Sequence, residues 1–232
     1  MLTRAALPLL MALLAGPGAA LAQQSPAPSG PPPASSLPVA MTFTLMTGAA
    51  NACGPGCATW IAAEGVVLPG TVVAFDAFAR QLGGARPPLV IHSQGGIVDV
   101  TLALGRIVRR TGLDTIVART DRSGDAPALA MDGECHGACF YLLAAGVNRS
   151  AAPGATVSIA PVDFKHQAGG ELPDALRARL IGATLERVRA YLTETGLDPT
   201  LSVYLDGDRY EPFYPTRGLM ETYGLVTKDP DF

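Results

Sequence analysis

The hydrophobic residues of the chain follow two different periods along its length. Short apolar runs and alternations predict strands, whereas apolar residues that recur every three or four positions predict helices. Because predicted strands and helices alternate, the expected fold class is α/β, with a parallel sheet, flanking helices and right-handed crossovers. Strands are predicted at 39–47, 60–67, 87–93, 114–119 and 156–160. Helices are predicted at 71–82, 97–111, 135–145, 173–195 and 216–223.

The first 22 residues have the pattern of a secretory signal peptide. Arg4 supplies a positive charge, residues 5–15 are apolar, and Ala20-Leu21-Ala22 is a small-residue cleavage motif. The apolar stretch is far shorter than the ~20 residues that cross a bilayer, and no later segment is long and apolar enough. We therefore expect cleavage between Ala22 and Gln23, and a periplasmic or secreted protein without a transmembrane segment.

Residues 23–38 are rich in Pro, Ser and Gly, a composition that favours an extended, solvated spacer. The folded domain is expected at 39–232. It is too apolar for a disordered protein, because 48% of the chain is hydrophobic and only 16% is charged. The 17 Lys and Arg residues face 20 Asp and Glu, for a net charge of −3. Without a basic excess, a nucleic-acid partner is not expected, and we expect no cofactor.

Three segments resemble the Clp-protease/crotonase superfamily, in the same order along the chain. Residues 88–110 (PLVIHSQGGIVDVTLALGRIVRR) resemble its unit of strand, Gly-Gly turn and helix. Residues 135–146 (CHGACFYLLAAG) resemble its nucleophile turn, and residues 214–226 (YPTRGLMETYGLV) resemble its closing helix and strand. With the export signal and the cysteines, the resemblance implies a Clp/crotonase-like domain of an exported, periplasmic branch.

The resemblance also implies that the catalytic residues of the superfamily are missing. Aligned on Ala138 and Cys139, the position of the nucleophilic Ser is Gly137, which has no side chain. The position of the catalytic His falls on Ala160. A shift of one residue would place His136 at the nucleophile position, which does not restore a serine hydrolase. The alignment therefore predicts a pseudoenzyme, without catalytic residues.

Part of an oxyanion-type site remains in the sequence. Gly95 and Gly96 follow a predicted strand and precede a helix, where backbone N–H groups can face a bound carbonyl or anion. The resemblance places the N–H of Ala138 at the same cleft. The alternative is that the two glycines only permit a tight turn.

The cysteines form two pairs with the same spacing. In an exported chain an even number of cysteines predicts disulfides, and we expect the local pairs Cys53–Cys57 and Cys135–Cys139. Two alternatives remain: a zinc site that includes His136, or a reactive Cys139 thiolate at a helix start.

Other polar residues have simpler interpretations. His92 can line the cleft but is expected to pack or to be half exposed, and His166 and Lys165 are expected at the surface. Residues 120–134 are expected to form a polar loop. Its acidic residues are expected to be solvated, because they lack the EF-hand spacing for calcium; they are Asp121, Asp125, Asp132 and Glu134.

These observations predict a non-catalytic module that binds a peptide, a small ligand or an envelope protein. The alternative is a hydrolase whose nucleophile, Ser93, Ser158 or Cys139, lies outside the superfamily alignment. A His within hydrogen-bond reach of one of these groups would favour the alternative. A structural envelope protein is the third hypothesis, favoured if side chains of the chain itself fill the cleft. Superfamily members form rings or trimers, so the resemblance allows a homo-oligomer.

Overall fold

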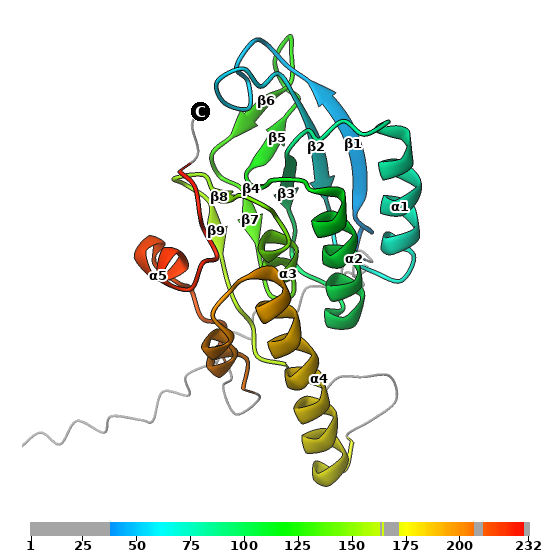
Figure 1. Cartoon of the computed structure of the whole chain (residues 1–232), viewed down its shortest axis with the longest axis vertical. Coiled ribbons are helices and arrows are strands. Elements are labelled where there is room, and N and C mark those ends of the chain that lie inside the picture. Colours follow the sequence, from blue (N-terminus) through cyan, green and yellow to red (C-terminus); the bar gives the residue numbers. More distant parts are fainter. Residues whose placement is uncertain (1–37, 163, 165–171, 207–210, 230–232) are drawn as a thin grey trace, which may run out of the picture. The chain divides into compact units, whose positions relative to one another are not determined.

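A five-stranded sheet lies at the centre of the computed structural model, which describes residues 38–162, 164, 172–206 and 211–229 (Figure 1). The strand order is β1-β2-β3-β4-β8, in which β1 is antiparallel to β2 and the other neighbours are parallel. Residues from Pro38 onward form one compact unit. The strands are β1 (Thr42–Thr47), β2 (Thr59–Glu64), β3 (Leu89–His92), β4 (Thr115–Val117) and β8 (Arg149–Ala151).

Helices cover one face of this sheet. Crossover helices follow β2 and β3, as the alternation of elements predicts, and α2 packs against both α1 and α3. The expected α/β fold class is confirmed, and the five predicted helices are present within a few residues of their expected ends. The helical elements are α1 (Thr71–Gln81), α2 (Val98–Thr111), α3 (Cys139–Ala144), α4 (Asp174–Thr195), a 3₁₀ helix (Pro199–Leu205) and α5 (Arg217–Thr222).

The alternation of side chains along the strands separates two hydrophobic clusters, because successive residues of a strand point to opposite faces. Ile61, Leu89 and Val117 point toward the helices and belong to the larger cluster. Trp60 and Val90 point to the other face, where a smaller cluster includes Cys53 and Leu129. Strands β2, β3 and β4 are therefore covered on both faces, which explains their nearly continuous apolar sequences.

Two features of residues 119–135 differ from the polar loop that the sequence predicts. Strands β5 (Arg119–Asp121) and β6 (Ala128–Ala130) form an antiparallel hairpin, and β7 (Glu134–Cys135) pairs in parallel with β9 (Thr156–Val157). The loop prediction is therefore wrong for these strands. The hairpin is held to the sheet by the indole N–H of Trp60, which donates to Thr120 Oγ1 at 3.0 Å. This contact spans 60 residues of sequence and leaves no local pattern.

Some sequence predictions fall on residues that the structure does not describe. The predicted signal peptide at 1–22 and nearly all of the linker at 23–38 lie outside the described residues, as do Lys165 and His166. Among the described residues, no helix has the length and apolarity needed to cross a membrane.

Candidate functional site

A cavity of about 520 Å³ opens beyond the carboxyl end of β3, between the starts of α2 and α3. The turn after β3 forms one wall, and the turn before α3 forms another. The segment after β9 and one residue of α4 complete the lining. The cavity brings together all five positions that the sequence assigns to a lost active site: Gly95, Gly96, Gly137, Ala138 and Ala160.

The two glycines after β3 are required by close backbone contacts. A Cβ on Gly96 would overlap the carbonyl oxygen of Val67, and a Cβ on Gly95 would lie 2.7 Å from that of His136. Gly95 has a φ of 106° and Gly96 a φ of 150°, and such positive angles disfavour side chains. These glycines therefore do more than permit a turn, because they let three chain segments approach one another.

Backbone hydrogen bonds around the two glycines decide which amide faces the cavity. The Gly95 N–H donates to Ser93 Oγ at 3.1 Å, so this amide is already bonded. Val67 donates to the Gly95 carbonyl and accepts from the Ile97 N–H, which directs the Gly96 N–H away from Val67. Among the described residues, neither the Gly96 N–H nor the Ala138 N–H has an acceptor. Both residues line the cavity, so each brings to it an N–H group without an acceptor in the described part of the chain.

Gly137 and Ala160 lie beside each other at the cavity. Gly137 has a φ of +53°, and a Cβ built there would have one described atom within 4 Å, the Cβ of Ala160 at 3.6 Å. Two side chains at these positions would touch. The space in front of Gly137 is open, because neither residue carries atoms beyond Cβ.

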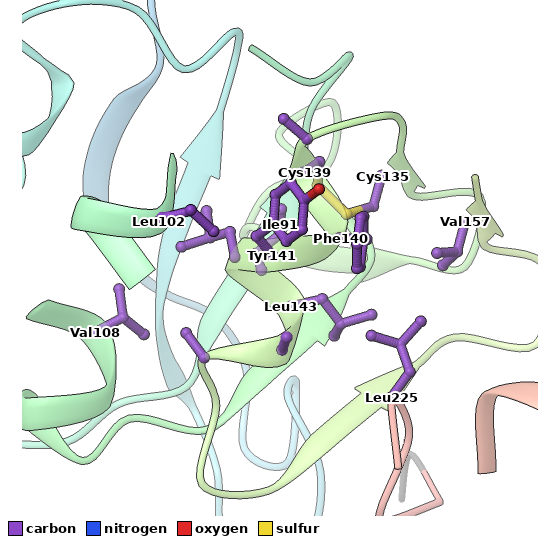
Figure 2. Close-up of a cluster of buried hydrophobic side chains, with 14 of the residues drawn as sticks. Ile91, Leu102, Val108, Cys135, Cys139, Phe140, Tyr141, Leu143, Val157 and Leu225 are labelled. Carbon is purple, nitrogen blue, oxygen red and sulfur yellow. A yellow bond between two sulfur atoms is a disulfide. The ribbon is translucent and has the colours of Figure 1, made fainter. Parts of the chain in front are cut away.

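Tyr141 of α3 also lines the cavity. Its side chain is buried, and its backbone carbonyl accepts the hydroxyl of Tyr191 at 2.7 Å. Helical side chains point back toward the helix start, and Figure 2 shows the Tyr141 hydroxyl directed toward the beginning of α3. Burial raises the pKa of Tyr141, so the hydroxyl stays protonated and can donate. The sequence analysis missed this residue, because a Tyr within an apolar helix has the pattern of a core residue.

The charged groups at the cavity are paired with each other. Asp99, in the first turn of α2, accepts two hydrogen bonds from Arg187 of α4, at 2.8 and 3.1 Å. Arg187 also donates to Thr184, whose side chain lines the cavity. No lysine or arginine among the described residues lines the cavity itself.

Both predicted disulfides are present in the structure. Cys135 and Cys139 are joined beneath the turn that carries Gly137, and both are fully buried (Figure 2). Cys53 and Cys57 are joined beside a smaller cavity of about 190 Å³ at the opposite edge of the sheet. The alternatives of a Cys139 thiolate and of a zinc site using these cysteines are therefore wrong.

The two serine candidates for a nucleophile have different surroundings. Ser93 Oγ bonds to the backbone of Gly95 and contacts no histidine among its described partners. Ser158 Oγ lies 2.9 Å from Nδ1 of His136, so this pair meets the distance criterion for a serine and its base. Ser158 is only 2% exposed, however, and neither it nor His136 lines the cavity.

The remaining candidates make polar contacts outside the cavity. His92 is half buried, and its Nδ1 accepts the N–H of Glu134 at 3.1 Å. Asp132 pairs with Arg119, whose hydrogen bond to the carboxylate lowers the pKa of Asp132. Asp121 accepts the N–H of Ser123, and this bond lowers its pKa. Among the described residues, no cluster of histidine, cysteine and acidic side chains has the geometry of a metal site.

The fold is similar to solved structures of proteases. A mutant of the 1510-N membrane-bound stomatin-specific protease is 14% identical over 72% of this chain and 76% of that chain, with a TM-score of 0.50. A second mutant of that protease, in complex with a substrate peptide, is 14% identical over 70% and 69% of the two chains, with a TM-score of 0.47. A ClpP1 mutant from Listeria monocytogenes is 17% identical over 68% and 84%, with a TM-score of 0.44.

These similarities define a class of fold and no more. The chain has a Clp-protease-like α/β fold. A scan against protein-family models and a search of curated proteins both give no match.

Proposed function

We propose that this protein is a non-catalytic binding module, built on a Clp-protease-like fold, whose cavity holds a peptide or a small ligand. One observation carries the proposal: the cavity combines the N–H groups of Gly96 and Ala138, which have no acceptor among the described residues, with Gly137 and Ala160 at the positions that the alignment assigns to the serine and the histidine. Gly137 and Ala160 lie next to each other, at these two positions. A group bound there can be held by hydrogen bonds but not attacked.

The cavity is open enough for a ligand to enter. Ile97 at its rim is 44% exposed, and about 520 Å³ is not filled by described side chains. Ligand pockets in proteins have volumes of ~300–1,000 Å³ and combine apolar walls with a few polar groups. These features support ligand binding over a purely structural envelope role.

The first experiment is labelling of the purified mature protein with a fluorophosphonate probe, read by intact mass and peptide mapping. We expect no serine to be labelled, because Ser93 and Ser158 are both 2% exposed and neither lines the cavity. Gly137→Ser with Ala160→His serves as the positive control for probe access. Labelling of one serine in the unmodified protein would overturn the non-catalytic proposal.

A second candidate function is a serine hydrolase, and the contact of Ser158 with His136 favours it. The pair has the required distance, but its serine is buried outside the cavity, and the contact uses Nδ1 of the histidine. Tyr214 packs edge-on against the His136 ring, with ring centroids 6.4 Å apart. We interpret the contact as structural, because it ties the start of α3 to the end of β9.

The fluorophosphonate experiment also separates the two candidates. The hydrolase hypothesis predicts labelling at Ser158 that is lost in His136→Ala. Our proposal predicts that Ser158→Ala leaves ligand binding at the cavity within about twofold of the unmodified protein, because Ser158 does not line it.

We further propose that the protein is exported. The predicted signal peptide supports this location, and two disulfides are typical of oxidising compartments. An intact mass that retains the first 22 residues after secretion in a bacterial host would contradict it.

A further inference from the structure

The Cys53–Cys57 disulfide lies near the surface, in the loop between β1 and β2. Cys53 is 6% exposed and Cys57 is half buried, whereas Gly56 at the tip of the loop is exposed. No described atom lies within 4 Å of a Cβ built on Gly56, so an approaching molecule can reach this side of the loop. The Cys135–Cys139 disulfide differs, because both of its residues are fully buried.

Hydrogen bonds that do not involve sulfur hold the loop in shape. The Cys53 N–H donates to the Cys57 carbonyl at 3.2 Å, and the Cys57 N–H donates to the Gly54 carbonyl at 2.9 Å. The Gly56 N–H donates to Oδ1 of Asn51 at 2.7 Å. We therefore expect the two cysteines, whose Cα atoms are 5.0 Å apart, to stay close together when the disulfide is open.

The reduced pair would have a hydrogen-bond acceptor in place. The carbonyl oxygen of Thr59 lies 3.6 Å from Sγ of Cys53 and 3.6 Å from Sγ of Cys57. A thiol at either position can donate to this oxygen, although it is a weak donor. The loop can therefore hold one thiol while the other sulfur reacts.

Positive charge surrounds the two sulfur atoms. Both cysteines line the cavity of about 190 Å³, and the same lining includes Arg86 and Lys228. The carboxylates of the lining, Asp114 and Asp229, are each hydrogen-bonded to another residue. Nearby lysine and arginine side chains favour the thiolate form of a cysteine. A thiolate that attacks the disulfide and the thiolate that leaves it are both stabilised by this charge.

We propose that Cys53–Cys57 is a thiol–disulfide exchange site whose substrate is a dithiol. This activity is separate from the binding function proposed for the cavity between α2 and α3, and it does not depend on that function. Sγ of Cys57 is the atom that an incoming thiolate attacks, because Cys57 is the more exposed of the two cysteines.

The exchange has two steps and balances without a further reactant. First, a substrate thiolate bonds to Sγ of Cys57, the disulfide bond breaks, and its electron pair leaves on Sγ of Cys53. The second substrate thiolate then attacks the substrate sulfur of the mixed disulfide, which closes the substrate's own disulfide and releases Cys57 as a thiolate. The substrate loses two electrons, which the two cysteines gain. The protons of the substrate thiols pass through water to the two cysteine thiolates.

The shape of the loop selects a dithiol over a monothiol. After the first step, the Cys53 thiolate remains beside the mixed disulfide, because the backbone hydrogen bonds hold the loop. It re-forms the original disulfide faster than a second monothiol molecule can attack, since its effective concentration is high. A dithiol competes with Cys53, because its second thiol is also tethered to the mixed disulfide.

The test uses the full mature protein in its oxidised form and two peptides, acetyl-Cys-Ala-Ala-Cys-amide and acetyl-Ser-Ala-Ala-Cys-amide. Reactions at equal thiol concentration are quenched with acid and mapped by mass spectrometry. We expect the dithiol peptide to produce at least about tenfold more reduced Cys53 and Cys57 than the monothiol peptide, together with an equal amount of cyclised peptide. The monothiol peptide should form its adduct on Cys57.

The second disulfide is an internal control in the same reactions. Cys135–Cys139 should react at least about a hundredfold more slowly, because a buried disulfide becomes accessible only when the domain opens.

Substitutions test the two cationic residues. Arg86→Gln with Lys228→Gln should slow reduction by the dithiol peptide at least about fivefold, because positive charge stabilises the attacking and leaving thiolates. Arg80→Gln with Arg110→Gln is the matched control, which removes two exposed charges outside the lining of this cavity. It should react within about twofold of the unmodified protein. Circular dichroism shows whether each variant is folded.

Each outcome supports or overturns a stated part of the proposal. Equal rates for the two disulfides in the folded protein would overturn it. Adducts mainly on Cys53 would overturn the assignment of the attacked sulfur, and reduction by the monothiol as fast as by the dithiol would overturn the substrate class. An unchanged rate in the doubly substituted protein would overturn the role of the cations. The fluorophosphonate experiment tests the other cavity, so its result is independent of these.

Discussion

A Cβ built on Gly137 would lie 3.6 Å from the Cβ of Ala160, although the two residues are 23 positions apart in the sequence. The pairing of β7 with β9 brings them together, because Gly137 follows β7 and Ala160 follows β9. The Cys135–Cys139 disulfide holds one side of this arrangement. The assignment of these two positions to a lost serine and a lost histidine stays a prediction, and the variants below test it.

The first prediction concerns restoring both groups. Gly137→Ser with Ala160→His should hydrolyse p-nitrophenyl acetate slowly, because under our proposal the Gly96 and Ala138 amides remain available to bind the oxyanion. Neither single variant should show activity above the unmodified protein. The double variant should remain weak, since a non-glycine residue at a φ of +53° carries strain of about 1–2 kcal/mol. The release of p-nitrophenol, compared at matched protein concentrations, measures the rates.

Activity in either single variant would contradict this prediction. Equal activity in Gly137→Ser and in the double variant would mean that a base other than the introduced histidine serves the serine. Activity of the unmodified protein that disappears in Ser158→Ala would show that the alignment itself is wrong.

A buried arginine gives the second prediction. Arg149 is 5% exposed, and its guanidinium donates to the carbonyls of Gly146, Thr195 and Gly224, at 3.2, 3.1 and 2.8 Å. Gly146 follows α3, Thr195 is the last residue of α4, and Gly224 follows α5. Arg149→Met should lower the free energy of unfolding by at least about 3 kcal/mol, because the carbonyls of Thr195 and Gly224 lose this donor, whereas Gly146 keeps the hydrogen bond from Arg109. Urea denaturation followed by circular dichroism measures the change.

Arg110→Met is the matched control for that experiment. Arg110 is exposed at the end of α2, and its replacement should change the stability by less than about 0.5 kcal/mol. Similar losses in the two variants would show that the buried contacts of Arg149 contribute little.

The third prediction concerns the contact between α2 and α4. A Cβ on Gly105 would overlap the hydroxyl oxygen of Tyr191, so Gly105→Ala must displace that ring. We expect a loss of about 1–3 kcal/mol in the free energy of unfolding from overpacking. In a Tyr191→Phe background the same substitution should cost at least about 1 kcal/mol less, because the clashing oxygen is gone. Additive effects in this double-mutant cycle would contradict the contact.

The fourth prediction distinguishes the two disulfides. Cys57 is half exposed beside a small cavity, whereas Cys135 and Cys139 are both fully buried. Under mild reduction with dithiothreitol and iodoacetamide trapping, Cys53 and Cys57 should be alkylated first, and Cys135 and Cys139 only under denaturing conditions. Without reductant, no cysteine should be alkylated, and labelling of Cys135 in that state would exclude the second disulfide. Peptide mapping by mass spectrometry measures each site.

Several features of this protein follow from the sequence alone, because they depend on neighbours in the chain. The periods of apolar residues predict the helices and most strands of the sheet, since burial of one face leaves a regular pattern. The pairing of cysteines four positions apart is likewise local, because a single turn brings such residues within disulfide distance. The two glycines after β3 and the missing side chain at Gly137 are also evident without coordinates.

Other features depend on contacts between distant segments, and only the tertiary structure decided them. The hairpin of β5 and β6 is stabilised by Trp60, and β8 is a short strand whose Arg149 has the sequence pattern of a surface residue. The structure shows that the amide of Gly95 is bonded to Ser93, whereas the amide of Gly96 has no acceptor among the described residues. It also places Tyr141 in the lining of the cavity. A local pattern reports which face of an element is buried, but the partner of each buried group depends on how the chain returns to it.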